Sequence, residues 1–194
     1  MVKLIGNKKI NSAVFISGKG SNFYNLAKFS MLKNSKFKIN LVISNNQKAQ
    51  GLIFAKKFKI KKKIINFKKN NYAENKILKL LNKNKINLIC LAGFMKILSR
   101  NFIKRFKGKI INIHPSLLPK YKGLNTHERV IKNKEKYSGC TVHFVSSKLD
   151  SGKIILQKKV KVLKKDTPSS LAKKILKQEH LLYAKAIEKV YSNL

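Results

Sequence analysis

Mainly apolar runs alternate with amphipathic stretches along most of this chain. Residues 12–17, 39–44 and 87–93 are short apolar runs of the kind that forms buried strands. Residues 23–33 and 49–58 have apolar side chains at helical spacing, which predicts a helix after each of the first two strands. Buried strands that alternate with helices favour an open, mostly parallel, twisted sheet with helices on both faces.

The same alternation continues through the middle of the chain. We expect further strands at residues 63–66 and 108–114, and helices at 73–84 and 98–106, the last with Ser99 as its N-cap. The first half of the chain is therefore a strand–helix repeat, which is typical of a Rossmann-like α/β fold.

The pattern changes in the last third of the chain. Residues 139–147 and 153–162 alternate apolar and polar positions, as half-exposed antiparallel strands do. A long C-terminal helix is expected over residues 166–194, with Thr167 as its N-cap and Pro168 at its first helical position. The α/β sheet should therefore carry antiparallel strands and a long helix in its C-terminal part.

The strand at residues 108–114 ends in polar groups that suit catalysis. Asn112 and His114 point to the same side of an extended segment, at the end of a parallel strand where ligands bind in open α/β sheets. The amide can donate to an oxyanion, and the neighbouring imidazole can move protons. This combination indicates acyl transfer or hydrolysis. A histidine with a purely structural role fits the spacing as well. Pro115 and Pro119 stiffen the turn that follows, and we expect a cis bond before Pro119.

A catalytic histidine normally has an orienting carboxylate, and the chain has only seven acidic residues. Asp150 is the best candidate, because it lies in a polar turn between two predicted strands; a simple Asx-turn is the alternative interpretation. Asp166 fits a turn or helix start, and the role of Glu179 stays open. Exposed positions on helices are expected for Glu128, Glu135 and Glu188.

The glycine-rich loop at residues 18–22 follows the first strand and precedes the first helix. It lacks the third glycine of the dinucleotide-binding fingerprint, since Phe23 stands at that position. No Gly-Lys-Ser/Thr sequence follows at the spacing of a phosphate-binding loop. The backbone N–H groups of Gly20, Ser21 and Asn22 at a helix N-terminus could still hold a single phosphate. A tight turn without a ligand is the other interpretation.

The net charge and the length of the chain change little in the predicted fold and site. The net charge of +38 invites a nucleic-acid interpretation, but lysine is spread along almost every segment and interleaved with apolar residues. We therefore expect a solvated basic surface with no specific nucleic-acid partner and at most weak nonspecific binding of polyanions. At 194 residues the chain is long enough for one domain, residues 1–194.

Several classes of protein are disfavoured. No apolar run is long enough to span a membrane, and the first residues do not form a signal peptide, so a cytoplasmic location and no membrane partner are expected. Cys90 and Cys140 lie in strand-like runs without metal-ligand spacing, which favours two buried thiols over a disulfide or zinc site.

The strongest signal is a set of six segments in a fixed order. They are ISGKGSN, LAGFMKILS, INIHPSLLPKYKG, GCTVHFV, LDSGKIILQ and QEH. Together they closely resemble the glycinamide ribonucleotide formyltransferase family of purine biosynthesis, over about residues 12–191. Each segment alone would be a weak signal, but all six in register are specific.

The resemblance implies an activity and a set of catalytic residues. A formyl group would pass directly from 10-formyltetrahydrofolate to the amine of 5'-phosphoribosylglycinamide, without a covalent enzyme intermediate and without a metal. Asn112 would bind the oxyanion of the tetrahedral intermediate, His114 would stabilise it and assist proton movement, and Asp150 would orient His114 and tune its pKa.

The resemblance also implies binding residues. Those for the substrate phosphate and ribose would be Gly18, Lys19, Gly20, Ser21, Asn22 and Glu179. Those for the folate would be Met95, Lys96, Ile97, Leu98, Asn112, Ser146, Ser147, Lys148, Leu149 and Asp150.

Two positions depart from the family's pattern. Lys96 stands where arginine is common, which keeps the charge but loses the planar fork. Asn70 stands where some relatives have an arginine near the phosphate, and whether the neighbouring Lys68 and Lys69 replace it is left open.

Other functions share part of this pattern. A tRNA formyltransferase has the same core but carries a second domain that 194 residues would not accommodate, and a formyltetrahydrofolate deformylase differs after the histidine. A catalytically idle, basic RNA-binding protein is the alternative from another class. The expected partners are thus small molecules, and both a monomer and a homodimer stay open.

Overall fold

Seven strands form one sheet in the order β3-β2-β1-β4-β5-β6-β7 in the computed structural model, which describes residues 9–68 and 70–191. The first five strands in this order run parallel, and β6 and β7 are antiparallel to their neighbours. The strands are β1 (Ile10–Ile16), β2 (Phe37–Ser44), β3 (Lys61–Ile64), β4 (Leu88–Leu91), β5 (Lys109–His114), β6 (Tyr137–Phe144) and β7 (Ile154–Lys161).

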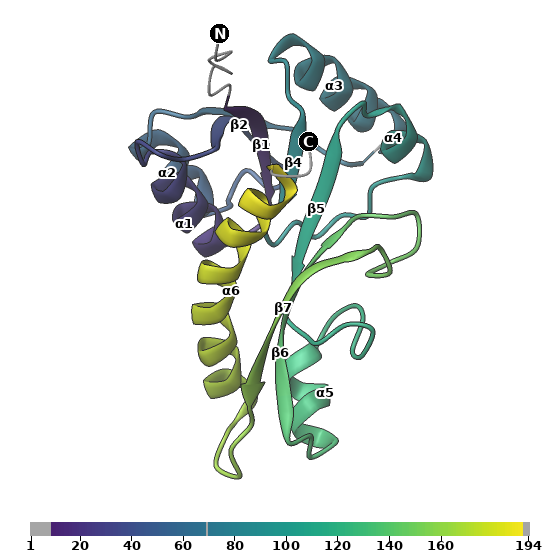
Figure 1. Cartoon of the computed structure of the whole chain (residues 1–194). Helices are drawn as coiled ribbons and strands as arrows, with labels where there is room; N and C mark the ends of the chain where they lie inside the picture. Colours follow the sequence, from purple (N-terminus) through teal and green to yellow (C-terminus); the bar gives the residue numbers. More distant parts are fainter. Residues whose placement is uncertain (1–8, 69, 192–194) are drawn as a thin grey trace, which may run out of the picture.

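Helices cover both faces of this sheet (Figure 1). They are α1 (Ser21–Ser30), α2 (Gly51–Lys57), α3 (Asn70–Lys83), α4 (Arg100–Arg105), α5 (Thr126–Lys132) and α6 (Pro168–Tyr191). Helices α1, α2, α5 and α6 pack on one face, whereas α3 and α4 pack on the other. The predicted fold class is confirmed, including the antiparallel strands and the long last helix.

Alternation along the strands divides the core into two layers. Val14 of β1 packs towards α1 and α6, whereas its neighbour Phe15 packs with Ile77 of α3, because successive strand side chains point to opposite faces. Tyr183 fastens the long helix to the sheet. It is fully buried, and its hydroxyl lies 2.9 Å from the carbonyl oxygen of Leu91 at the end of β4.

Several local predictions can be compared with the structure. Ser99 caps α4 by accepting from the N–H of Phe102, and Thr167 caps α6 by accepting from the N–H of Ser170, so both predicted N-caps are confirmed. The Leu118–Pro119 bond is cis, as expected.

Some boundaries were wrong. Strand β3 lies two residues earlier than predicted, and α3 begins three residues earlier, at Asn70. The last predicted residues, 192–194, lie outside the described part of the chain. Glu135 is not on a helix face: it follows α5 and accepts hydrogen bonds from Lys120 and Tyr121.

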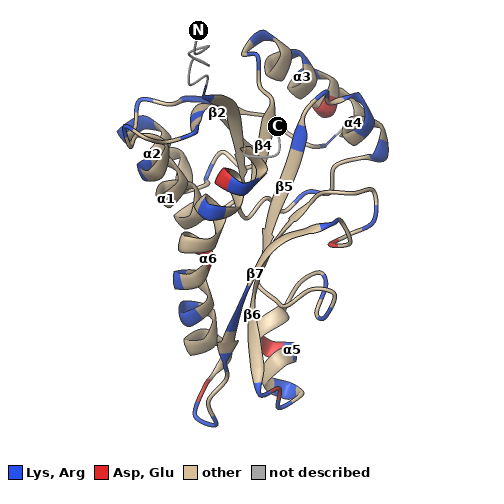
Figure 2. Ribbon diagram, in the orientation of Figure 1, with Lys and Arg blue, Asp and Glu red and all other residues tan. Residues whose placement is uncertain are grey.

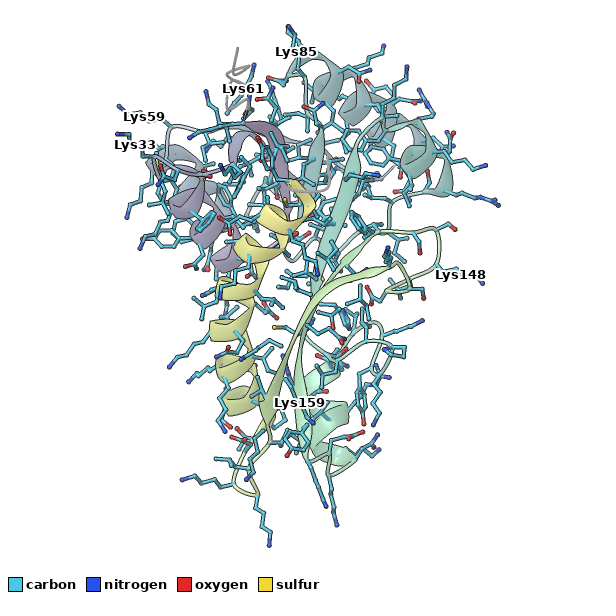
Figure 3. All side chains as sticks on the ribbon, in the orientation of Figure 1. Lys33, Lys59, Lys61, Lys85, Lys148 and Lys159 are labelled. Atoms are coloured by element: carbon cyan, nitrogen blue, oxygen red, sulfur yellow. The ribbon has the colours of Figure 1, made fainter. Side chains whose placement is uncertain are left out.

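Basic side chains are spread over most of the helices, strands and loops (Figure 2). The labelled lysines in Figure 3 point outward from different parts of the molecule; they are Lys33, Lys59, Lys61, Lys85, Lys148 and Lys159. This distribution agrees with a solvated basic surface. Within residues 9–68 and 70–191, no helix is long and apolar enough to cross a membrane.

The two cysteines are free and buried, as predicted. Burial raises the pKa of the Cys140 thiol to about 12, so this thiol is protonated at neutral pH. Both cysteines belong to the core layer beneath α1 and α6.

Candidate active site

A cavity of about 1020 Å³ opens at the carboxyl ends of β4 and β5. It lies next to the point where the strand order reverses, because β2 and β3 follow β1 on one side and β4 and β5 follow on the other. Open α/β sheets bind ligands at such a switch point. The cavity is also bordered by the 145–150 loop between β6 and β7, by Asn22 of α1 and by Glu179 of α6.

His114 and Asp150 form a nearly buried pair in this cavity. His114 Nδ1 lies 3.4 Å from Asp150 Oδ2, which also accepts a hydrogen bond of 2.9 Å from the N–H of Gly123. The other ring nitrogen, Nε2, lies 2.8 Å from the carbonyl oxygen of Tyr121. Both ring nitrogens of His114 therefore face oxygen acceptors, and a doubly protonated ring can donate to both.

Asn112 lies beside a second histidine that the sequence interpretation missed. Its Nδ2 lies 3.3 Å from His143 Nε2, while His143 Nδ1 lies 2.9 Å from the carbonyl oxygen of Phe144. Because a carbonyl only accepts, we assign the proton to Nδ1, which leaves Nε2 to accept from Asn112. Burial lowers the pKa of His143, and this favours the neutral ring that the assignment needs.

On the opposite wall, Glu179 of α6 lies against Asn22 of α1. Asn22 Nδ2 donates to Glu179 Oε2 over 2.7 Å, and both side chains are buried. Burial raises the pKa of Glu179, and the hydrogen bond from Asn22 partly opposes this. Asn22 Oδ1 is buried and has no partner among the described residues, so it can accept from a ligand.

The predicted phosphate loop is a tight structure against α2. Gly20 has a φ of 73°, and a Cβ there would lie 2.5 Å from the Cα of Gly51. The carbonyl of Gly18 accepts a hydrogen bond of 3.0 Å from the Gly51 N–H. Of the predicted loop residues only Asn22 lines the cavity; Gly18, Lys19, Gly20 and Ser21 do not.

Whether lysines replace the arginine that some relatives have near the phosphate stays open. Lys68 and Asn70 are exposed and do not line the cavity, and Lys69 lies outside the described residues.

The residues predicted to bind folate all line the cavity. They are Met95, Lys96, Ile97, Leu98, Asn112, Ser146, Ser147, Lys148, Leu149 and Asp150. Met95, Ile97 and Leu149 are more than half exposed, although they are large and apolar. Ser17 at the end of β1 accepts a 2.7 Å hydrogen bond from the Met95 N–H, which fixes this loop to the sheet. An exposed apolar wall with polar groups at its base suits a large, mainly apolar ligand.

Some lining residues escaped the sequence interpretation. Besides His143, they include Thr126 and His127 at the start of α5. Burial lowers the pKa of His127, whose Nδ1 has no partner among the described residues. The composition held a signal that points to this site, because histidines and acidic residues are rare in the chain. Three of the four histidines and three of the seven acidic residues border this cavity.

The donor set does not resemble a metal centre. Within the described part of the chain, no group of three or more His, Cys, Asp or Glu side chains is arranged to hold a metal ion.

An amide, an imidazole and a carboxylate at the switch point of a doubly wound sheet are the arrangement of an acyl-transfer or hydrolytic enzyme. Residues 10–187 match the formyl transferase family, and the chain belongs to this family. The resemblance found in the sequence is thereby confirmed.

The chain is also similar to individual proteins whose names state a function. The chain is 41% identical to the phosphoribosylglycinamide formyltransferase of Haemophilus influenzae over 184 residues, which are 93% of this chain and 86% of that protein. It is 42% identical over 188 residues to the human trifunctional purine biosynthetic protein adenosine-3, covering 95% of this chain but 19% of that protein. The chain thus spans about a fifth or less of the length of the trifunctional relatives it matches.

Solved structures of phosphoribosylglycinamide formyltransferases have the same fold as this chain. The phosphoribosylglycinamide formyltransferase of Brucella melitensis superposes with a TM-score of 0.91 at 39% identity, covering 96% of this chain and 98% of that one. The enzyme of the same name from Anaplasma phagocytophilum gives 0.89 at 42% identity, covering 96% and 89%.

Proposed function

We propose that this chain transfers the formyl group of 10-formyltetrahydrofolate to the amine of 5'-phosphoribosylglycinamide, a step of purine biosynthesis. The observation that carries the proposal is the buried His114–Asp150 pair beside Asn112 in a cavity with an apolar wall. The bacterial relatives of similar length, which are named for this reaction, support it. A single domain over residues 1–194, a cytoplasmic location and a monomer or homodimer remain predictions.

In the proposed reaction the substrate amine attacks the formyl carbon, and the carbonyl oxygen becomes an oxyanion. The new C–N bond forms, the bond between the formyl carbon and N10 of the folate breaks, and one proton moves from the amine to N10. Asn112 would donate one N–H of its amide to the oxyanion while His143 accepts the other. The hydrogen bond to His143 would fix the amide before the substrate arrives.

His114 would supply positive charge beside this oxyanion. In its doubly protonated form the ring can donate to Asp150 at Nδ1 and to the Tyr121 carbonyl at Nε2. Proton transfer from Nε2 to the substrate would require the bond to Tyr121 to be exchanged for one to the substrate. Asp150 would keep the ring oriented during that exchange.

The two substrates would approach from different walls. Backbone N–H groups at the N-terminus of α1 would bind the phosphate, and Glu179 would accept from the ribose hydroxyls. The folate would lie against Met95–Leu98 and the 146–150 loop. No residue of the reaction scheme requires a metal.

The test is a formyl-transfer assay with purified protein and both substrates. His114→Ala and Asp150→Asn should each reduce kcat by about a hundredfold or more, whereas Asp166→Asn, outside the cavity, should leave it within twofold. No transfer by the folded wild-type protein would overturn the proposal. Formate release without the ribonucleotide would indicate a deformylase, and salt-sensitive retention of RNA by an inactive protein would indicate a nucleic-acid binder.

A further inference from the structure

The segment of residues 120–124 lies between β5 and α5 and contacts both members of the His114–Asp150 pair. The carbonyl of Tyr121 accepts from His114 Nε2 at 2.8 Å, and the N–H of Gly123 donates to Asp150 Oδ2 at 2.9 Å. Main-chain groups two residues apart thus hold the outer ring nitrogen of His114 and the carboxylate oxygen of Asp150 that faces the ring. The relative position of His114 and Asp150 therefore depends on the position of the backbone of residues 120–124.

The Tyr121 side chain fastens the segment to the end of α5. Its hydroxyl donates to Glu135 Oε1 at 2.9 Å and accepts from Asn133 Nδ2 at 2.9 Å. The Arg129 guanidinium lies 5.1 Å from the Tyr121 ring centroid, and its Nη1 donates to the carbonyl of Lys122 at 2.7 Å. Side chain and backbone of the segment are thus both tied to α5 and the turn after it.

Two further observations fit a fastening role. Tyr121 has a φ of 56°, a left-handed conformation that costs free energy in a non-glycine residue and needs surrounding contacts to persist. The hydrogen bonds from Lys120 and Tyr121 lower the pKa of Glu135, which keeps this acceptor ionised at neutral pH.

We propose that Tyr121, held by Glu135 and Arg129, is a positioning residue for the His114–Asp150 pair. None of the three lines the cavity, so they would act through the 120–124 segment and not on the substrate. The inference rests on the proposed function, in which His114 and Asp150 act during formyl transfer.

The first experiment compares Tyr121→Phe with the wild-type protein. The variant keeps the ring over Arg129 and removes the hydroxyl that binds Glu135 and Asn133. We expect kcat to fall about three- to tenfold, with KM for both substrates within twofold, because positioning affects the reacting geometry. The matched control is Tyr72→Phe, an exposed tyrosine on α3, which should change neither constant.

Glu135 variants separate positioning from a general loss of stability. Glu135→Gln keeps an acceptor for the Tyr121 hydroxyl and should retain at least half of kcat, whereas Glu135→Ala should match Tyr121→Phe. The double variant should lose less than the product of the two single losses, because both changes break the Tyr121–Glu135 contact. If Tyr121→Phe fails to fold, the difference between the two Glu135 variants decides.

A second readout does not depend on activity. The ¹⁵N signals of the His114 ring, recorded without substrates, should shift in Tyr121→Phe and Glu135→Ala but not in Tyr72→Phe or Glu135→Gln. An active wild type whose kcat and His114 signals are unchanged by Tyr121→Phe would overturn the inference. An inactive wild type whose signals shift as expected would instead refute the proposed function and leave the positioning contact supported.

Discussion

At the scale of single residues, burial opposes the ionisation of Glu179. Its burial raises its pKa, and the amide of Asn22 stabilises the ionised form. If Glu179 accepts from the ribose, Glu179→Gln should raise KM for the ribonucleotide about tenfold by weakening a charged hydrogen bond. KM for the folate, measured on the same protein, is the internal control. An equal rise in both constants would contradict this role.

Buried histidines give the stability a pH dependence. Burial lowers the pKa of His143 and of His127, so below pH of about 6.5 the unfolded chain binds protons that the folded chain does not. Their contribution to stability is present above that pH and is lost as the pH falls. Glu179 acts in the opposite direction, because its raised pKa favours the folded state on acidification.

The measurement is urea unfolding at pH 7.5 and pH 5.5, with His143→Gln beside the wild type. The free energy of unfolding should drop less on acidification in the variant, since one depressed pKa has been removed. Equal drops in the two proteins would show that His143 is protonated as readily in the folded state as in the unfolded one.

The residues of the site differ in how far the sequence reveals them. Asn112 and His114 follow from the two-residue period of one strand, which is a local property. His143 was missed because its place beside Asn112 depends on the antiparallel register of β5 and β6, where these two residues are paired. Asp150 was proposed from a turn and a resemblance, and its contact with His114 required the fold to bring residues 36 positions apart together.

Among the elements, α6 carries Glu179 and Tyr183 and begins at a capped first turn. Thr167 accepts from the Ser170 N–H, and Asp166 accepts from Lys174 Nζ at 2.6 Å. Thr167→Ala should lower the free energy of unfolding by about 1 kcal/mol through loss of the N-cap. Ser169→Ala, at an exposed neighbouring position, should change it by only about 0.3 kcal/mol or less. Thermal or urea unfolding of both variants measures the difference.

Element types were easier to predict than element boundaries. The long strands and α6 have strong periodic patterns that the fold preserves. Strand β3 was misplaced because three of its four residues are exposed lysines, which pair with Leu41–Ile43 of β2. The apolar Ile65, by contrast, is buried just outside the strand. Lysine side chains on an edge strand also hinder pairing with another sheet, which is a function that hydropathy does not reveal.

In the whole molecule, a large share of the few acidic groups borders the cavity. Only seven acidic residues accompany 45 basic ones, and Glu128, Asp150 and Glu179 all border the cavity. Basic residues are spread over helices, strands and loops in the rest of the molecule (Figure 2). An anionic ligand therefore meets a long-range attractive field before it reaches a site whose local charges are mixed.

This field predicts a salt dependence that depends on the charge of the folate. A polyglutamylated 10-formyltetrahydrofolate carries several carboxylates, and Lys96 and Lys148 place part of the net charge of +38 at the cavity. Raising the salt concentration from about 0.1 M to about 1 M shortens the screening length from about 10 Å to about 3 Å. KM for the polyglutamate should therefore rise severalfold, with kcat little changed, because screening slows association more than chemistry. The monoglutamate provides the control, since fewer charges should give a smaller rise; the same rise for both, or none for either, would show that the basic surface has no part in capturing the cofactor.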